Sequence, residues 1–158
     1  MKIYLSVGKG NGETEISAFD NALLEAGVAN TNLIILSSVI PKNPEIINQS
    51  RKIEVADYGK KMYVVMAQKR TAIIGKKICA GIGYVLEIHN LFGLFVEHVG
   101  SNFNEVNNLI NLSLNDMIAN RKEFQFSSPK TLINETKCEK KPVCVLTIAS
   151  YKIEDWGE

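Results

Sequence analysis

Residues that build metal sites and disulfide frameworks are scarce in this sequence. Its 158 residues include only three cysteines and two histidines. The cysteines, Cys79, Cys138 and Cys144, form no C-x-x-C pair, which argues against a disulfide framework and against a thiolate zinc site. His89 and His98 alone are too few for a histidine-rich metal site. We therefore expect no metal ion and a reducing, cytoplasmic environment.

Long apolar runs and an excess of one charge are also missing. No apolar stretch approaches the ~18 residues that a membrane-spanning helix needs, and residues 1–7 lack the pattern of a signal peptide or anchor. The 18 Lys and Arg residues nearly balance the 17 Asp and Glu residues, which leaves a formal net charge of +1. Binding to a nucleic-acid backbone normally requires a clear basic excess. We therefore expect neither a membrane nor a nucleic acid as a partner.

The residues that are present fit a single domain over residues 1–158. Hydrophobic residues make up 46% of the chain and charged residues 22%, close to the average of globular proteins. Because the expected helices and strands do not alternate strictly, their order favours an α+β fold over a Rossmann sheet. Apolar spacing predicts strands over 1–7, 33–36, 63–67 and 91–99. It predicts helices over 16–26, 74–85 and 101–118, the last with Ser101 as its N-terminal cap. Two final strands are predicted at 124–126 and 144–148, joined by a turn near residues 140–142.

A glycine-rich segment follows the first expected strand. Gly8, Gly10 and Gly12 alternate with polar residues there. The segment matches neither the phosphate-binding pattern G-x-x-x-x-G-K-[ST] nor the dinucleotide pattern G-x-G-x-x-G. We interpret it as a plain tight turn without a ligand. The G-x-S-x-G motif of many hydrolases is absent as well.

The chain contains two Ser-Ser dipeptides, Ser37-Ser38 and Ser127-Ser128. The first follows Asn32 and the apolar run 33–36, which we expect to be a buried strand. The second lies between strand-like segments without such a run before it. Context therefore separates the two pairs, although spacing alone does not assign chemistry to either.

Two blocks of the sequence resemble one enzyme family, the pyruvoyl-dependent arginine decarboxylases. The matching stretches are Gly12-Glu13-Thr14, Ala18-Phe19-Asp20, Ala22-Leu23-Leu24, Ala26-Gly27, Asn30-Thr31-Asn32-Leu33-Ile34, Ser37-Ser38-Val39-Ile40-Pro41 and Gly93-Leu94-Phe95-Val96-Glu97-His98-Val99-Gly100. The resemblance implies an αββα four-layer sandwich that forms homotrimers, alone or as a dimer of trimers, with active sites between neighbouring subunits. It also implies conversion of L-arginine to agmatine and CO2 in polyamine biosynthesis.

The same resemblance implies that the chain cuts itself between Ser37 and Ser38. Ser38 Oγ would attack the carbonyl carbon of Ser37, and elimination would leave a covalent pyruvoyl group in place of Ser38. The products would be a β chain, residues 1–37, and an α chain, residues 38–158. A protein-bound ketone can accept the electrons that decarboxylation leaves, a task that pyridoxal phosphate usually performs. Asn32 resembles the residue that assists self-processing by hydrogen-bonding the developing oxyanion.

The remaining site residues follow from the resemblance in the same way. Glu97 resembles the proton donor of the reaction. Asp20 resembles the carboxylate that receives the guanidinium group of the substrate, a bidentate pairing that favours arginine over lysine. Leu23 and Ile16 would form apolar walls for the methylene groups of the substrate, and Ser37 would line the same pocket.

Two alternatives stay open. The chain could perform the same chemistry on another amino acid, or it could be an uncut, non-catalytic subunit of a trimeric complex. The sequence departs from the family pattern at Ala29, at His98 and at residues 9–11. None of these departures removes a reacting group, but selectivity depends on pocket contacts, so they leave the substrate more open than the reaction type.

Overall fold

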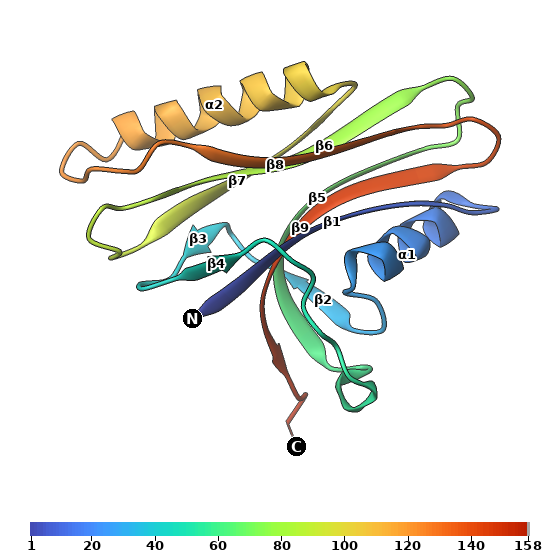
Figure 1. Ribbon diagram of the computed structural model, residues 1–158, viewed down its shortest axis with the longest axis horizontal. Coiled ribbons are helices and arrows are strands. Elements are labelled where there is room, and N and C mark those ends of the chain that lie inside the picture. Colours follow the sequence, from blue (N-terminus) through green and yellow to red (C-terminus); the bar gives the residue numbers. More distant parts are fainter. Residues whose placement is uncertain (158) are drawn as a thin grey trace.

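The computed structural model describes residues 1–157, which contain two α-helices and nine strands (Figure 1). The elements are β1 (Lys2–Asn11), α1 (Glu15–Ala26), β2 (Asn32–Ile35), β3 (Val39–Ile40), β4 (Glu45–Ile47), the short 3-10 helix η1 (Val55–Asp57), β5 (Lys61–Thr71), β6 (Lys77–Leu86), β7 (Gly93–Gly100), α2 (Phe103–Ala119), β8 (Lys130–Lys137) and β9 (Val143–Glu154). Within these residues, neither helix combines the length and apolar character needed to cross a bilayer.

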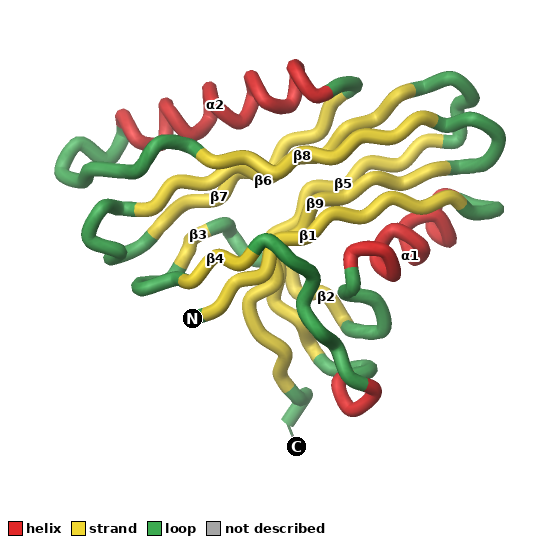
Figure 2. The backbone as a smooth tube through the Cα atoms, viewed as in Figure 1, coloured by secondary structure: helices red, strands yellow, loops and turns green. Residues whose placement is uncertain are grey.

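The strands form two sheets (Figure 2). One sheet has five strands in the order β2-β5-β9-β1-β4, and the other has four in the order β3-β7-β6-β8. Long antiparallel ladders join β1 and β5 to the central strand β9, whereas β2 pairs with β5, and β4 with β1, in parallel. In the second sheet, β6 pairs antiparallel with both β7 and β8. The predicted mixed α+β class is therefore confirmed.

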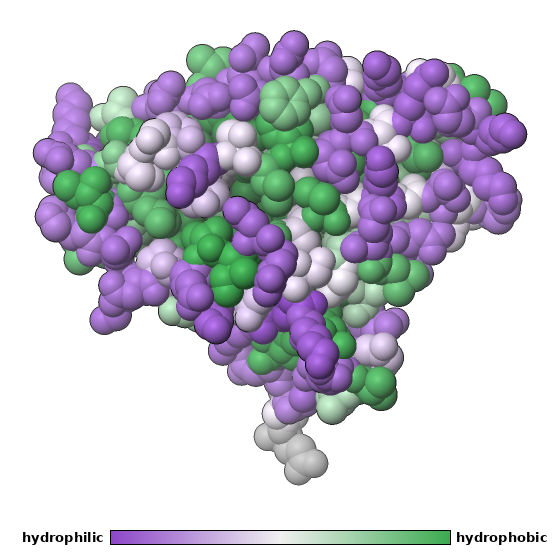
Figure 3. Space-filling model, in the orientation of Figure 1, coloured by the Kyte–Doolittle hydropathy of each residue, from purple (hydrophilic) through white to green (hydrophobic). Residues whose placement is uncertain are grey.

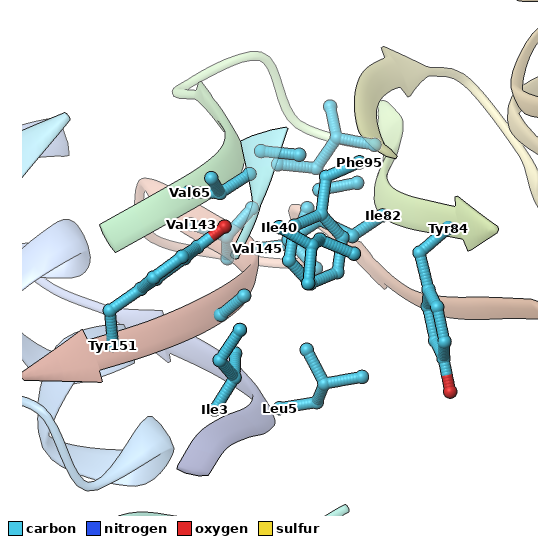
Figure 4. Close-up of a cluster of buried hydrophobic side chains, with 14 of the residues drawn as sticks. Ile3, Leu5, Ile40, Val65, Ile82, Tyr84, Phe95, Val143, Val145 and Tyr151 are labelled. Atoms are coloured by element: carbon cyan, nitrogen blue, oxygen red, sulfur yellow. The ribbon is translucent and has the colours of Figure 1, made fainter. Parts of the chain in front are cut away.

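Three clusters of buried side chains hold the helices and sheets together. Successive residues of a strand point to opposite faces, so β9 contributes to two clusters. Val145 and Ala149 join residues of the four-stranded sheet in the cluster between the sheets (Figure 4), and Cys144 and Leu146 face α1. The third cluster joins Ile110 and other residues of α2 to β6 and β7. Each sheet thus has one face against the other sheet and one face against a helix.

Helix α1 begins and ends where its local sequence predicts. Thr14 and Ser17 form a reciprocal capping box, in which the side chain of each accepts a hydrogen bond from the backbone N–H of the other. Gly27 ends the helix in the left-handed conformation, with φ of 73°, which glycine adopts at little cost. The helix predicted over residues 16–26 is therefore confirmed.

The glycine-rich segment was wrongly predicted as a turn. Gly8 and Gly10 lie inside β1, where α1 crosses the strand. A Cβ atom on either glycine would collide with backbone atoms of Ala22. These glycines therefore let the helix approach the sheet closely, and only Gly12 lies beyond the strand.

The predicted helix over residues 74–85 was also wrong, because this segment forms most of β6. Nearly every residue of β6 is buried, since one face meets the other sheet and the other face meets α2. A strand that is apolar on both faces satisfies helical spacing as readily as strand spacing. Gly81 and Gly83 fit this arrangement, because Ile110 of α2 occupies the space next to them.

The boundaries near α2 differ slightly from the prediction. Asn102, rather than Ser101, caps the helix, and its Oδ1 accepts a hydrogen bond from Glu105 N at 3.0 Å. Residues 124–126 do not form a strand, apart from one bridge between Phe126 and Glu87. The strand that follows α2 is β8, and the predicted turn near residues 140–142 does join it to β9.

Candidate active site

Ser37 and Ser38 lie where the chain passes from one sheet to the other. β2 runs parallel to β5 in the five-stranded sheet, and this pairing extends to Leu36, whose N–H donates to Val64 O at 2.8 Å. Directly after the serines, Val39 pairs with Leu94 of β7 in the four-stranded sheet. The Ser37–Ser38 peptide bond therefore links two elements that are each held by a different sheet.

Ser38 has an unusual backbone conformation and a charged neighbour. Its φ is +67°, in the left-handed region that residues with a Cβ atom rarely occupy. Its Oγ donates a hydrogen bond to Glu97 Oε1 at 2.5 Å, and its carbonyl accepts one from Phe95 N at 2.8 Å. A conformation of this kind costs about 1–3 kcal/mol and persists only where the surrounding contacts impose it. The strands on both sides of Ser38 and these two bonds supply such contacts.

Glu97 lies on the face of β7 that is turned toward the other sheet, and Tyr151 of β9 lies close to it. The Tyr151 side chain is buried, and its hydroxyl donates to Val39 O at 3.2 Å. Burial and the negative charge of Glu97 both raise the pKa of Tyr151. The sequence contains no signal for this tyrosine, because it is one apolar position among many in β9. The structure therefore adds Tyr151 to the surroundings of Ser38.

Asn32 lies at the opposite end of β2 from the serines. Its Nδ2 donates to Gly59 O at 2.7 Å, and its side chain is exposed. β2 spans Asn32–Ile35, and its three steps alone separate Asn32 from Ile35 by about 10 Å, with the serines beyond it. Within one chain, Asn32 therefore does not reach the carbonyl of Ser37.

The three candidate substrate residues on α1 also lie apart from Ser38. Figure 1 shows α1 and β3 on different sides of β1. Asp20 is exposed and Ile16 is 73% exposed, whereas Leu23 is half-buried against the cluster beneath the helix. Among residues 1–157, Asp20 makes no salt bridge. One chain thus joins Ser38 to Glu97 but does not join this pair to Asp20, Leu23 or Ile16.

Two buried cysteines and a charged surface hollow are further features of the described residues. Burial is the main reason that the pKa values of Cys79 and Cys144 rise to about 11, so both thiols are protonated and poor nucleophiles near neutral pH. A surface hollow of about 580 Å³ between β1 and the β8–β9 turn is lined by Lys9, Lys137 and other charged residues, none of which belongs to the candidate site.

Comparison with known proteins points to one family. The family model described as "Pyruvoyl-dependent arginine decarboxylase (PvlArgDC)" matches residues 2–154. Curated proteins of that name are similar to this chain. The protein of Picrophilus torridus is 32% identical over 85 residues, which are 54% of this chain and 47% of that protein. The protein of Thermoplasma volcanium is 26% identical over 139 residues, 87% of this chain and 75% of that protein.

A third relative, from Thermococcus kodakarensis, is 33% identical over 99 residues, 63% of this chain and 61% of that protein. The match thus spans about half the length of the Picrophilus protein and more of the other two. The family model, in contrast, covers almost all of this chain. The chain therefore belongs to the pyruvoyl-dependent arginine decarboxylases, a family of enzymes whose cofactor is a covalently bound pyruvoyl group.

Proposed function

We propose that this chain cuts itself between Ser37 and Ser38 and then decarboxylates L-arginine to agmatine, a reaction that serves polyamine biosynthesis. The observation that carries the proposal is the position of Ser38. This residue lies between two sheets with a left-handed backbone conformation, and its hydroxyl is 2.5 Å from the carboxylate of Glu97. Family membership supports the reaction type, and the arginine in the relatives' names supports the substrate.

The residues at this point fit a pyruvoyl group made from the chain itself. Ser38 Oγ adds to the carbonyl carbon of Ser37, and the C–N bond breaks to leave an ester. Loss of the Cα proton of residue 38 expels the carboxylate of Ser37, and one water then releases ammonia. The result is a β chain of residues 1–37 and an α chain that starts with the pyruvoyl group in place of Ser38. When present, this group supplies a ketone that accepts electrons from the α-carbon of the substrate.

Glu97 acts as the proton donor in this proposal. Its carboxyl group already contacts the side chain of residue 38 in the uncut chain, so it lies beside the position of the reacting carbon. A general acid must be within hydrogen-bond reach of the atom that it protonates, and the contact with residue 38 supports this role because the substrate reacts at that residue. In this role Glu97 delivers a proton to carbon after CO2 leaves.

We infer that a second copy of the chain completes the site. Asp20, Leu23, Ile16 and Asn32 lie away from Ser38 in one chain, yet all four are needed near it for substrate binding and self-processing. Apolar groups around the serines are also left uncovered, because Ile35 is 58% and Val39 53% exposed. Figure 3 shows hydrophobic groups among the hydrophilic ones on one face of the single chain. A homotrimer with sites between neighbours would bring the α1 residues and Asn32 of one copy to Ser37 and Ser38 of the next.

The arrangement of layers supports the same family fold. We infer an αββα four-layer sandwich, in the order α1, five-stranded sheet, four-stranded sheet, α2. The three buried clusters support this order, since each joins two successive layers. The two inner layers then carry residue 38 and Glu97, and the outer layer formed by α1 carries the substrate residues for a neighbour.

The mass of the purified, folded protein tests the proposal. We expect two chains of residues 1–37 and 38–158, with a carbonyl reagent that labels the start of the longer one. Borohydride reduction in the presence of arginine should trap the substrate on that same chain end. A single 17.5 kDa species in folded material would contradict self-processing and would favour the uncut, non-catalytic subunit.

The substrate is tested separately. Arginine, ornithine, lysine and histidine should be compared as substrates of the processed enzyme by release of CO2. A planar guanidinium pairs with a carboxylate through two parallel hydrogen bonds, which an ammonium group cannot form, so arginine should give the highest kcat/KM. A higher kcat/KM with another of these amino acids would overturn the assignment of arginine and leave the reaction type intact.

A further inference from the structure

The chain end that self-processing would create is held by few contacts. β3 has only two residues, Val39 and Ile40, which pair with β7. Two further hydrogen bonds hold Ser38 and Val39: Phe95 N donates to Ser38 O at 2.8 Å, and the Tyr151 hydroxyl donates to Val39 O at 3.2 Å. Before the cut, β2 also restrains Ser38 through the chain. After the cut, only the contacts on the carboxyl side of the broken bond remain.

Tyr151 supplies the hydrogen bond that comes from the opposite sheet. Its side chain extends from β9 into the cluster between the sheets (Figure 4), and the residue is 4% exposed. Its ring meets the ring of Phe95 edge to face, with 6.3 Å between centroids. Its own carbonyl accepts a hydrogen bond from Arg51 Nη2 at 2.6 Å. Tyr151 is thus fixed at its backbone, at its ring and at its hydroxyl.

The hydroxyl of Tyr151 remains a hydrogen-bond donor at neutral pH. Burial and the charge of Glu97 raise its pKa above the ordinary value for tyrosine, so the phenol keeps its proton. The Val39 carbonyl has no proton and can only accept. The donor and acceptor roles of this bond are therefore fixed.

We propose that Tyr151 is a positioning residue, whose hydroxyl keeps residue 38 beside the Glu97 carboxyl after the Ser37–Ser38 bond is cut. This inference rests on the proposed function. Chain ends fray unless they are tied down, and a shift of about 1 Å in a reacting group can cost on the order of 100-fold in rate. Because Phe95 and Tyr151 belong to different sheets, their two bonds hold adjacent carbonyls from two sides.

The test compares Tyr151→Phe with Tyr84→Phe. Both tyrosines lie in the same cluster, and the ring of Tyr84 also meets Phe95 edge to face. Figure 4 shows the Tyr84 hydroxyl pointing away from Phe95, and among residues 1–157 it makes no protein hydrogen bond. Each variant loses one hydroxyl from a buried ring, but only Tyr151→Phe loses the bond to Val39. Both should still be cut, as fragment masses will report.

We expect Tyr151→Phe to lower kcat about tenfold with KM within about twofold of the original, because binding is kept while the proton donor and residue 38 lose their alignment. Hydrogen exchange, followed by mass spectrometry of the segment 38–44, should speed up about tenfold in the cut protein. The same substitution in the uncut Ser38→Ala chain should leave exchange in this segment nearly unchanged, because β2 still restrains it. Tyr84→Phe should match the unsubstituted protein in both measurements.

Three results would overturn the inference. Tyr151→Phe could match Tyr84→Phe in kcat and exchange. It could speed exchange equally in cut and uncut chains, or prevent folding of both, which would make its role purely structural. Failure of the proposed function is distinguishable, because the unsubstituted protein would then remain a single uncut chain whatever residue occupies position 151.

Discussion

The two Ser-Ser dipeptides of this chain have the same composition and different surroundings. Ser127 is bound to the end of β6 through two hydrogen bonds: its N–H donates to Leu86 O at 2.8 Å, and its Oγ accepts from Leu86 N at 3.1 Å. Neither Ser127 nor Ser128 has a positive φ. This pair extends a sheet edge in an ordinary conformation, and the half-buried Ser127 hydroxyl is already bound by a backbone N–H.

The Ser37–Ser38 pair bridges two sheets instead of extending one. Ser38 has a positive φ, and its hydroxyl contacts Glu97 rather than a backbone N–H. The comparison shows two features that composition alone does not reveal: a strained backbone, and a hydroxyl bound to an ionisable group instead of to the backbone. The fold supplies these features at one pair and withholds them at the other.

The largest expected effect is on self-cutting, when the Ser38 hydroxyl that distinguishes the first pair is removed. Ser38→Ala removes the attacking oxygen, so we expect an uncut chain without decarboxylase activity. Ser128→Ala is the matched control, since it removes the second hydroxyl of the other pair, and it should be cut normally. Intact-protein mass measures both. Normal cutting of Ser38→Ala would show that the bond before residue 38 is not the scissile one.

Glu97→Gln tests the carboxyl group that only the first pair contacts. The carboxamide oxygen can still accept the Ser38 hydroxyl, so cutting should continue, but the amide cannot deliver a proton to carbon. We expect kcat to fall by about 10²–10⁴-fold, the usual contribution of general acid catalysis. Glu123→Gln, in the loop after α2, provides a control that should keep full activity. An active Glu97→Gln enzyme would contradict the role of Glu97.

Asp20→Asn tests whether a second copy of the chain supplies a substrate-binding carboxylate to the Ser37–Ser38 pair. Loss of a charged partner for the guanidinium should raise KM for arginine, with kcat/KM reduced about 10–100-fold, equivalent to about 1.4–2.7 kcal/mol. Cutting should be unaffected. Co-expression of Asp20→Asn with Ser38→Ala chains should restore part of the activity, because one mixed site would combine an intact Asp20 with an intact residue 38. Unchanged arginine kinetics in Asp20→Asn would remove this residue from the site.

The smallest expected effect measures the backbone strain directly. In uncut chains, Ser38→Gly should be more stable than Ser38→Ala by about 1 kcal/mol, because glycine adopts a positive φ without steric cost. Ser128→Gly should show the reverse order against Ser128→Ala, since its φ is not positive and glycine only adds entropy to the unfolded chain. Urea denaturation of the four variants gives both differences. If the glycine and alanine variants had the same order of stability at both positions, the result would contradict backbone strain at Ser38.

Local sequence signals predicted parts of the fold well. Thr14, Ser17 and Gly27 define the ends of α1 through hydrogen bonds and dihedral preferences that involve only near neighbours. The same reasoning failed for β6, because a strand covered on both faces loses the alternation that distinguishes strands. It failed for Gly8 and Gly10 because their neighbour is a helix that crosses the strand.

The candidate site likewise contains residues that the sequence indicated and one that it did not. Family resemblance singled out Ser37, Ser38 and Glu97, and the structure brings Ser38 and Glu97 into contact. It did not indicate Tyr151, whose relevance comes from a hydrogen bond to Val39 in the opposite sheet. The roles of all the site residues stay predictions, and one chain does not bring Asn32 or Asp20 to the serines.

The sequence by itself determined the ends of α1 and the α+β class, and it singled out candidate reactive residues, since these depend on near neighbours or on recognisable short patterns. Only the tertiary structure decided that Ser38 is strained and that its hydroxyl meets a carboxylate 59 residues away. Both features arise because β2 and β3 are held by different sheets, and the pairing of strands that are distant along the chain is decided by packing of the whole domain.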